Sequence, residues 1–261
     1  SNPFSLKAFS KSLYNNLNIE EENEGSAMKV FVTRKIPQPG LDLLQKEFEV
    51  EVNPHDRAIT KQELMEAIRG KDGVLCLLTD PVDRDVINAE PKLKMIASYA
   101  VGYDNIDVSA ATKRGIPVSN TPGVLTETTA ELAWALLFSV ARRIAEGDRI
   151  TRAGNFTGWS PMLLLGQDIT NKTLGIIGAG RIGTAVALKS QGFNMNVLYT
   201  DEQRNEQLDR KLHAKKVPLP DLLKQSDFVS IHVPLTKQTY HLIGERELRM
   251  MKPTAILINT A

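Results

Sequence analysis

The sequence has little of three things: cysteine, long apolar runs and net charge. Its single cysteine, Cys76, cannot form a disulfide within the chain, which excludes a secreted scaffold held by disulfides. No apolar run approaches the roughly 18 residues that a membrane-spanning helix needs. Lysine and arginine total 32 against 31 aspartates and glutamates, so a net charge of +1 gives no general attraction to nucleic acid or to a membrane surface. We therefore expect a soluble, intracellular protein that binds neither.

What is present is an ordinary globular composition, with 42% hydrophobic and 24% charged residues. At about 150 residues per domain, the length predicts two domains. Residues 1–27 lie outside the folded pattern, because they are rich in serine and asparagine and then turn acidic at residues 20–24. We interpret them as a disordered tail or tag, with a trimmed organelle-targeting peptide as the alternative. Met28 is the candidate native start, and the expected location is cytoplasmic, or an organelle under the alternative.

Strand-like and helix-like segments alternate from Met28 to residue 120. Thr60 and Glu63 have the spacing of a capping box, and Gly70 marks the end of the helix that follows. Five strands alternating with helices predict an α/β domain with a doubly wound parallel sheet. The strand candidates delimited by apolar runs are residues 29–33, 74–78, 93–98 and 116–119.

A long helical segment, residues 126–153, separates this region from a second alternating one. Its apolar residues recur at intervals of three and four, and its middle is too apolar to face solvent, so it should lie in a core or a subunit interface. The second region predicts another parallel sheet. Its strand candidates are residues 174–177, 195–199, 215–217, 228–232 and 255–258.

A glycine-rich motif, Gly178-Ala179-Gly180-Arg181-Ile182-Gly183, follows the first of these strands and opens a helix. In this setting Gly178 permits the tight turn, Gly180 lets the backbone approach a pyrophosphate, and Gly183 lets the helix pack closely on the strand. The amino end of the helix offers free N–H groups and partial positive charge to the phosphates. The motif therefore predicts a Rossmann dinucleotide site.

Asp201 ends the next strand, 23 residues after the first glycine. A carboxylate there can bind the ribose hydroxyls of NAD and would repel the 2′-phosphate of NADP. We therefore favour NAD. Thr200 and Arg204 could surround a phosphate, so NADP stays an alternative.

The histidines and the cysteine offer little other chemistry. His232 ends a strand at the carboxyl edge where α/β proteins bind ligands, so it is a candidate cofactor neighbour and not a proton donor. Cys76 lies in a buried strand pattern and is interpreted as a structural thiol. No cluster has metal-ligand spacing, and no Gly-x-Ser-x-Gly elbow occurs. The other three histidines, which we expect at the surface, are His55, His213 and His241.

From Met28 to Ala261 the chain resembles the D-isomer-specific 2-hydroxyacid dehydrogenases, most of all the glyoxylate/hydroxypyruvate reductases. Five ordered segments carry the resemblance: residues 99–107, 120–132, 173–183, 226–235 and 251–261. It implies a flavodoxin-like substrate domain at residues 28–125 and an NAD(P)-binding Rossmann domain at 126–261. It also implies that residues 126–153 form a homodimer.

The resemblance also assigns binding residues. It implies that the backbone N–H groups of Val101 and Gly102 hold the substrate carboxylate; whether Leu78 also faces the substrate is left open. The residues that would line the adenine and nicotinamide sides of the dinucleotide, next to His232, are Val233, Pro234, Asn259, Thr260 and Ala261.

The implied activity is reduction of a small 2-keto acid, glyoxylate or hydroxypyruvate, to the D-2-hydroxy acid. The family's catalytic arginine follows an Asn-x-Ala motif directly, and here it would come after Ala261; the catalytic glutamate and histidine are likewise absent. Only two strands follow residue 225, so we expect these 261 residues to be the amino-terminal three-quarters of an enzyme, with an incomplete second domain. The alternative is a catalytically silent NAD(H)-sensing protein, similar to the corepressors that share this fold.

Overall fold

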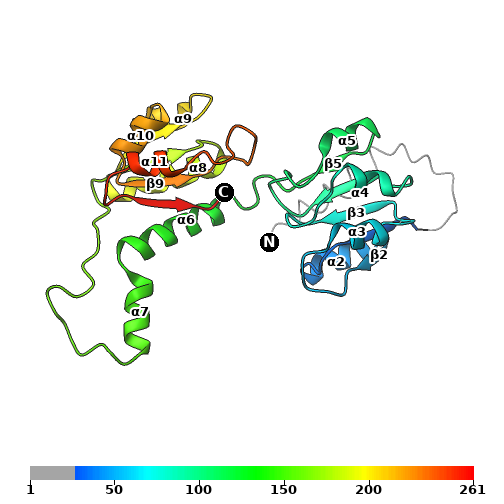
Figure 1. The fold of residues 1–261 in the computed structure, drawn as a ribbon, viewed down its shortest axis with the longest axis horizontal. Helices are drawn as coiled ribbons and strands as arrows, with labels where there is room; N and C mark the ends of the chain where they lie inside the picture. Colours follow the sequence, from blue (N-terminus) through cyan, green and yellow to red (C-terminus); the bar gives the residue numbers. More distant parts are fainter. Residues whose placement is uncertain (1–26) are drawn as a thin grey trace. The chain divides into compact units, whose positions relative to one another are not determined.

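The computed structural model describes residues 27–261, which form two compact units (Figure 1). The first ends at Val124 and the second spans Leu125–Ala261. Each contains one five-stranded sheet, and every strand pairing in both sheets is parallel. Among residues 27–261, no helix combines the length and the apolar character that a membrane span requires. The interpretation of residues 1–27 falls almost entirely outside the described residues.

The sheet of the first unit has the strand order β2-β1-β3-β4-β5, with β1 at the point where the winding direction changes. This is the flavodoxin-like order that the family resemblance implies. The capping box is present, since the Thr60 hydroxyl accepts a hydrogen bond from the Glu63 N–H and the Glu63 carboxylate accepts one from the Thr60 N–H. The elements are β1 (Lys29–Val32), α2 (Gln38–Gln45), β2 (Glu49–Val52), α3 (Lys61–Ala67), β3 (Gly73–Cys76), α4 (Arg84–Ala89), β4 (Met95–Ser98), α5 (Val108–Lys113) and β5 (Val118–Ser119).

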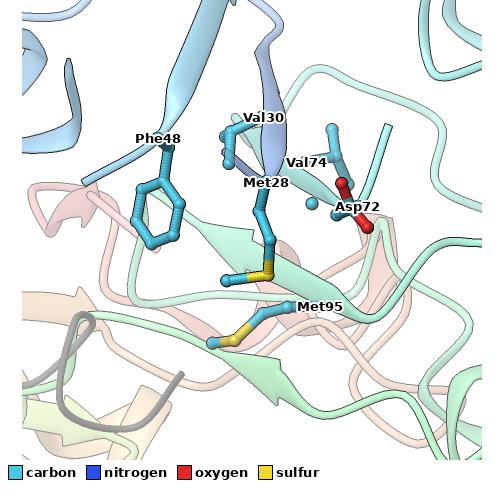
Figure 2. A pocket seen from close by; sticks show the side chains of 7 residues that line it. Met28, Val30, Phe48, Asp72, Val74 and Met95 are labelled. Atoms are coloured by element: carbon cyan, nitrogen blue, oxygen red, sulfur yellow. The ribbon is translucent and has the colours of Figure 1, made fainter. Parts of the chain in front are cut away.

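Apolar side chains cover both faces of this sheet, and every residue of β3 and β4 is buried. Figure 2 shows a small recess beside these strands, lined among others by the side chains of Met28, Phe48 and Met95. Its volume is about 10 Å³, roughly the space of one water molecule. Because Met28 precedes β1 and Met95 begins β4, the recess lies at the amino end of the strands, opposite the edge at which α/β proteins bind ligands.

The sheet of the second unit has the order β10-β9-β6-β7-β8, which matches five strands of a Rossmann sheet. Helix α6 packs on it, and the Trp134 indole N–H donates to the carbonyl of Val186 in α8 at 3.0 Å. The elements are α6 (Thr126–Ala141), α7 (Ile144–Arg152), β6 (Thr173–Ile177), α8 (Arg181–Lys189), the 3₁₀ helix η1 (Ser190–Phe193), β7 (Asn196–Thr200), α9 (Glu206–Leu212), β8 (Lys215–Lys216), α10 (Leu219–Gln225), β9 (Phe228–Ile231), α11 (Glu245–Met250) and β10 (Ile256–Asn259).

The helical stretch predicted over residues 126–153 is present, but a break divides it into the two helices α6 and α7 (Figure 1). Arg143 has φ 53°, in the left-handed region, which no α-helix continues. The carbonyl of Ala141 instead accepts a hydrogen bond from the N–H of Gln167 at 2.7 Å. A distant loop thus ends the apolar helix, and α7 has no buried residue.

Candidate functional site

Four strands of the second sheet end side by side at one edge, and most of the predicted cofactor residues follow them. Parallel register pairs Ile177 with both Thr200 and Ile231, and Ile231 with Asn259. Neighbouring points of the carboxyl edge of the sheet are therefore occupied by the glycine motif, Asp201 and His232. Doubly wound sheets bind ligands at this edge.

The three glycines of the motif differ in what surrounds them. Gly178 has φ 90°, and a Cβ there would lie 2.7 Å from the carbonyl oxygen of His232. A Cβ on Gly183 would lie 2.0 Å from the carbonyl oxygen of Gly178. A Cβ on Gly180 would meet no atom within 4 Å. The fold itself therefore requires glycine at 178 and 183, whereas Gly180 leaves open space beside the turn.

This open space faces unused donors at the start of α8. Gly180 is the N-cap residue and provides no side-chain cap. The backbone N–H groups of Gly180, Arg181 and Ile182 donate no hydrogen bond within residues 27–261. Free N–H groups and the positive end of the helix dipole together form an anion site. This arrangement fits the pyrophosphate of a dinucleotide.

The carboxylate of Asp201 lies directly against the turn. Its Oδ2 accepts a hydrogen bond from the Ala179 N–H at 2.7 Å, and its Oδ1 accepts one from the Gln203 N–H at 3.1 Å. Arg204, the candidate partner of a 2′-phosphate, pairs with Asp209. A negative charge at the turn and an occupied arginine favour NAD over NADP.

His232 follows β9, and its backbone carbonyl lies against Gly178. The ring Nε2 is 2.8 Å from the hydroxyl oxygen of Ser230, and the buried Nδ1 has no hydrogen-bond partner within the described part of the chain. Burial lowers the pKa of His232 to about 4. The ring is therefore neutral at neutral pH, consistent with a cofactor neighbour that is not a proton donor.

This pKa predicts how stability depends on pH. Above pH 6.5 the ring is neutral in both the folded and the unfolded chain. Between pH 6.5 and about 4 the unfolded chain binds a proton that the fold excludes, so His232 lowers the free energy of unfolding by up to about 1.4 kcal/mol per pH unit. We expect His232→Gln to lose less stability than the unmodified protein between pH 7 and 5, measured by denaturant unfolding. His55→Gln, at an exposed histidine, is the control and should change nothing.

The other residues assigned to the dinucleotide site lie at the same edge. A Cβ on Gly178 would be 2.8 Å from Cγ1 of Val233, which places this valine beside the turn. The carbonyl of Pro234 accepts a hydrogen bond from the Thr239 hydroxyl at 2.5 Å. After β10, the Asn259 carboxamide oxygen accepts one from the Ala261 N–H at 3.0 Å, and the buried hydroxyl of Thr260 has no partner within residues 27–261.

The candidate substrate residues follow β4 in the first unit. The backbone N–H groups of Val101 and Gly102 donate no hydrogen bond within the described residues, so two adjacent donors are available. The Val101 carbonyl is held by the Asn120 carboxamide at 2.8 Å. A Cβ on Gly102 would be 3.5 Å from Leu78, a leucine whose side chain is 55% exposed. The loops after β3 and β4 therefore meet beside these donors.

Two residues that sequence reasoning missed hold these loops together. The carboxylate of Asp80, only 2% exposed, accepts hydrogen bonds from the Leu77 N–H at 2.7 Å and from the Thr33 hydroxyl at 2.5 Å. The carboxamide of Asn105 donates to the carbonyls of Leu77 at 3.0 Å and Asp80 at 2.8 Å. The only signal in the sequence is the position of Asn105 in the segment 99–107; Asp80 has none.

Other chemistry is limited. Among residues 27–261, no group of three or more histidines, cysteines, aspartates or glutamates is placed to hold a metal ion. Burial raises the pKa of the Cys76 thiol to about 12, so this cysteine stays protonated and unreactive.

Comparison with known proteins agrees with this geometry. Residues 134–261 match the family model for the NAD-binding domain of D-isomer specific 2-hydroxyacid dehydrogenases. A glyoxylate reductase from Korarchaeum cryptofilum is 53% identical over 234 residues, which are 89% of this chain and 70% of that protein.

Two solved structures are similar along both units. The TT0316 protein from Thermus thermophilus has a TM-score of 0.82 and 43% identity, over 90% of this chain and 74% of that one. D-Lactate dehydrogenase from Aquifex aeolicus, solved with NAD and lactic acid, has a TM-score of 0.77 and 30% identity, over 89% of this chain and 68% of that one.

Proposed function

The chain belongs to the D-isomer-specific 2-hydroxyacid dehydrogenase family and is an NAD-dependent oxidoreductase, and we propose that its substrate is glyoxylate or hydroxypyruvate, reduced to the D-2-hydroxy acid. The relative from Korarchaeum cryptofilum, which is named a glyoxylate reductase, supports this choice. The relatives described above give no support to a catalytically silent NAD(H) sensor.

In the proposed reaction, the second unit holds the dinucleotide, which when bound supplies the hydride for the keto carbon. The N–H groups of residues 180–182 bind its pyrophosphate, and Asp201 accepts hydrogen bonds from the adenosine ribose. His232, Val233, Pro234 and residues 259–261 are proposed to line the adenine and nicotinamide sides.

The first unit binds the substrate in this proposal. The N–H groups of Val101 and Gly102 take the carboxylate, because two adjacent unpaired donors match its two oxygens. Leu78 lies beside them and limits the space next to the carboxylate, which favours a small 2-keto acid. No described residue is proposed as the proton donor, a role that the family resemblance gives to a His–Glu pair.

The test is a substrate panel on the full-length protein, whose intact mass is determined first. We expect oxidation of NADH with glyoxylate and hydroxypyruvate, a smaller kcat/KM for larger 2-keto acids, and D-glycerate as the product from hydroxypyruvate. If NADH is oxidised with larger 2-keto acids but not with glyoxylate or hydroxypyruvate, the proposed substrates are wrong. L-Glycerate as the product would reject the proposed stereochemistry.

We further propose that the protein is a homodimer through the helical region 126–153. Along α6, the buried residues pack into the core of the second unit, whereas a stripe of large apolar residues beside them is exposed. The members of this stripe are Leu132, Leu136 and Val140, and Ile144, the first residue of α7, is also exposed. Exposed large apolar residues gathered along one helix are typical of an association surface.

A further inference from the structure

We infer that Asn205 is a positioning residue for the dinucleotide, which acts on Asp201 through Ala179 and so contributes to the preference for NAD over NADP. This inference rests on the placement of the dinucleotide at the glycine turn proposed above. Asn205 itself precedes α9 and is not part of the glycine motif or of the strand end that carries Asp201.

The side chain of Asn205 connects three elements. Its amide nitrogen donates to the Ala179 carbonyl and to the Thr184 hydroxyl, both at 2.8 Å. Its amide oxygen accepts from the Leu208 N–H at 3.0 Å and thereby caps α9. The Thr184 hydroxyl in turn donates to the same Ala179 carbonyl at 3.1 Å. Asn205 therefore joins the start of α9 to the glycine turn and to the first turn of α8.

Ala179 is held at both of its backbone polar groups. Its carbonyl accepts from Asn205 and Thr184, and its N–H donates to Oδ2 of Asp201 at 2.7 Å. The Ala179 N–H thus fixes one oxygen of the Asp201 carboxylate, and the Gln203 N–H holds the other, so the position of Ala179 contributes to the orientation of this carboxylate. That carboxylate is the group that accepts from the ribose hydroxyls of NAD and repels a 2′-phosphate. Loss of the Asn205 amide should therefore weaken the discrimination between the two dinucleotides.

The backbone of Asn205 is fixed independently of its side chain. Its N–H donates to the hydroxyl oxygen of Tyr199 at 3.0 Å, and this hydroxyl donates to Asp209 at 2.9 Å. The Tyr199 side chain is fully buried in the core. Replacing the Asn205 side chain therefore removes the links to Ala179 and Thr184 without releasing the segment.

The experiment measures dissociation constants of NADH and NADPH by fluorescence titration. Asn205→Ser keeps an N-cap acceptor for α9 but is too short to reach Ala179. We expect the Kd of NADH to rise about tenfold, as for one or two lost hydrogen bonds, while the Kd of NADPH rises less. The Kd of NADPH divided by the Kd of NADH should therefore fall at least about threefold.

Tyr199→Phe is the matched control. It removes the hydroxyl that fixes the Asn205 backbone and leaves the side-chain links in place, so it should lower the unfolding midpoint and keep the ratio. Equal weakening of both dinucleotides in Asn205→Ser, or no weakening, would overturn the inference.

The variant Asp201→Ala distinguishes a failure of the inference about Asn205 from a failure of the proposed dinucleotide site. If both dinucleotides bind Asp201→Ala as they bind the unmodified protein, the proposed placement of the dinucleotide is wrong, and the inference falls with it. If Asp201→Ala weakens NADH and Asn205→Ser does not, only the inference is wrong.

Discussion

Gly180→Val should abolish detectable NADH binding, with a Kd raised at least about 100-fold, and should leave the thermal unfolding midpoint within about 2 °C of the unmodified protein. A Cβ at this position meets no atom of the protein within 4 Å, so the fold has room for a side chain. That same space adjoins the free N–H groups of residues 180–182, where a valine would exclude the pyrophosphate. Isothermal titration with NADH and calorimetric unfolding measure the two quantities.

Two other glycines provide matched controls for this variant. Gly192→Val also adds a side chain where no atom lies within 4 Å, but away from the turn, so it should retain NADH binding. Gly183→Val should fail to fold, because even its Cβ would lie 2.0 Å from the Gly178 carbonyl oxygen. Unchanged NADH affinity in Gly180→Val would show that the glycine turn is not the dinucleotide site.

Those parts of the fold that depend on neighbours in the sequence could be predicted from it. The capping box of Thr60 and Glu63 joins residues three apart, and the glycine motif is one turn followed by one helix. Strand β2 lacks an apolar run, since its residues alternate between glutamate and valine at the edge of the sheet, and the sequence pattern did not delimit it. The end of α6 depends on the Ala141 carbonyl meeting the Gln167 N–H, 26 residues later, which no local pattern encodes.

The residues of the candidate site fall into the same two groups, those that the sequence could predict and those that it could not. The residues expected to touch the dinucleotide lie at strand ends, where the rule for parallel sheets places ligands. The residues that hold them in place act over long separations: Asn205 is 26 residues from Ala179, and Asn105 is 28 from Leu77. A polar residue in a loop usually binds solvent or its own backbone, so only the tertiary structure identifies such partners.

The double variant Leu136→Glu/Val140→Glu should be a monomer under conditions in which the unmodified protein is a dimer. Both side chains belong to the exposed apolar stripe of α6, at 39% and 54% exposure, and neither supports the core of its own unit. A symmetric dimer contains each substitution twice, so four carboxylates would enter the interface, each desolvated without a partner at a cost of several kcal/mol.

Sedimentation velocity at protein concentrations from 1 to 50 μM measures the shift from dimer to monomer. We expect the apparent dimer Kd to rise at least about 1,000-fold, because a loss of about 4.1 kcal/mol in association free energy corresponds to that factor. Glu131→Lys on the same helix is the control, because it changes the charge of an exposed residue without removing apolar area, and it should remain dimeric. A double variant that stays dimeric would place the interface elsewhere, and an unmodified protein that is monomeric at 50 μM would reject the dimer itself. Because Leu136 and Val140 are exposed and do not belong to the core cluster, loss of the dimer should leave the core of the second unit intact. The circular dichroism spectrum should therefore stay unchanged, which separates lost association from lost folding.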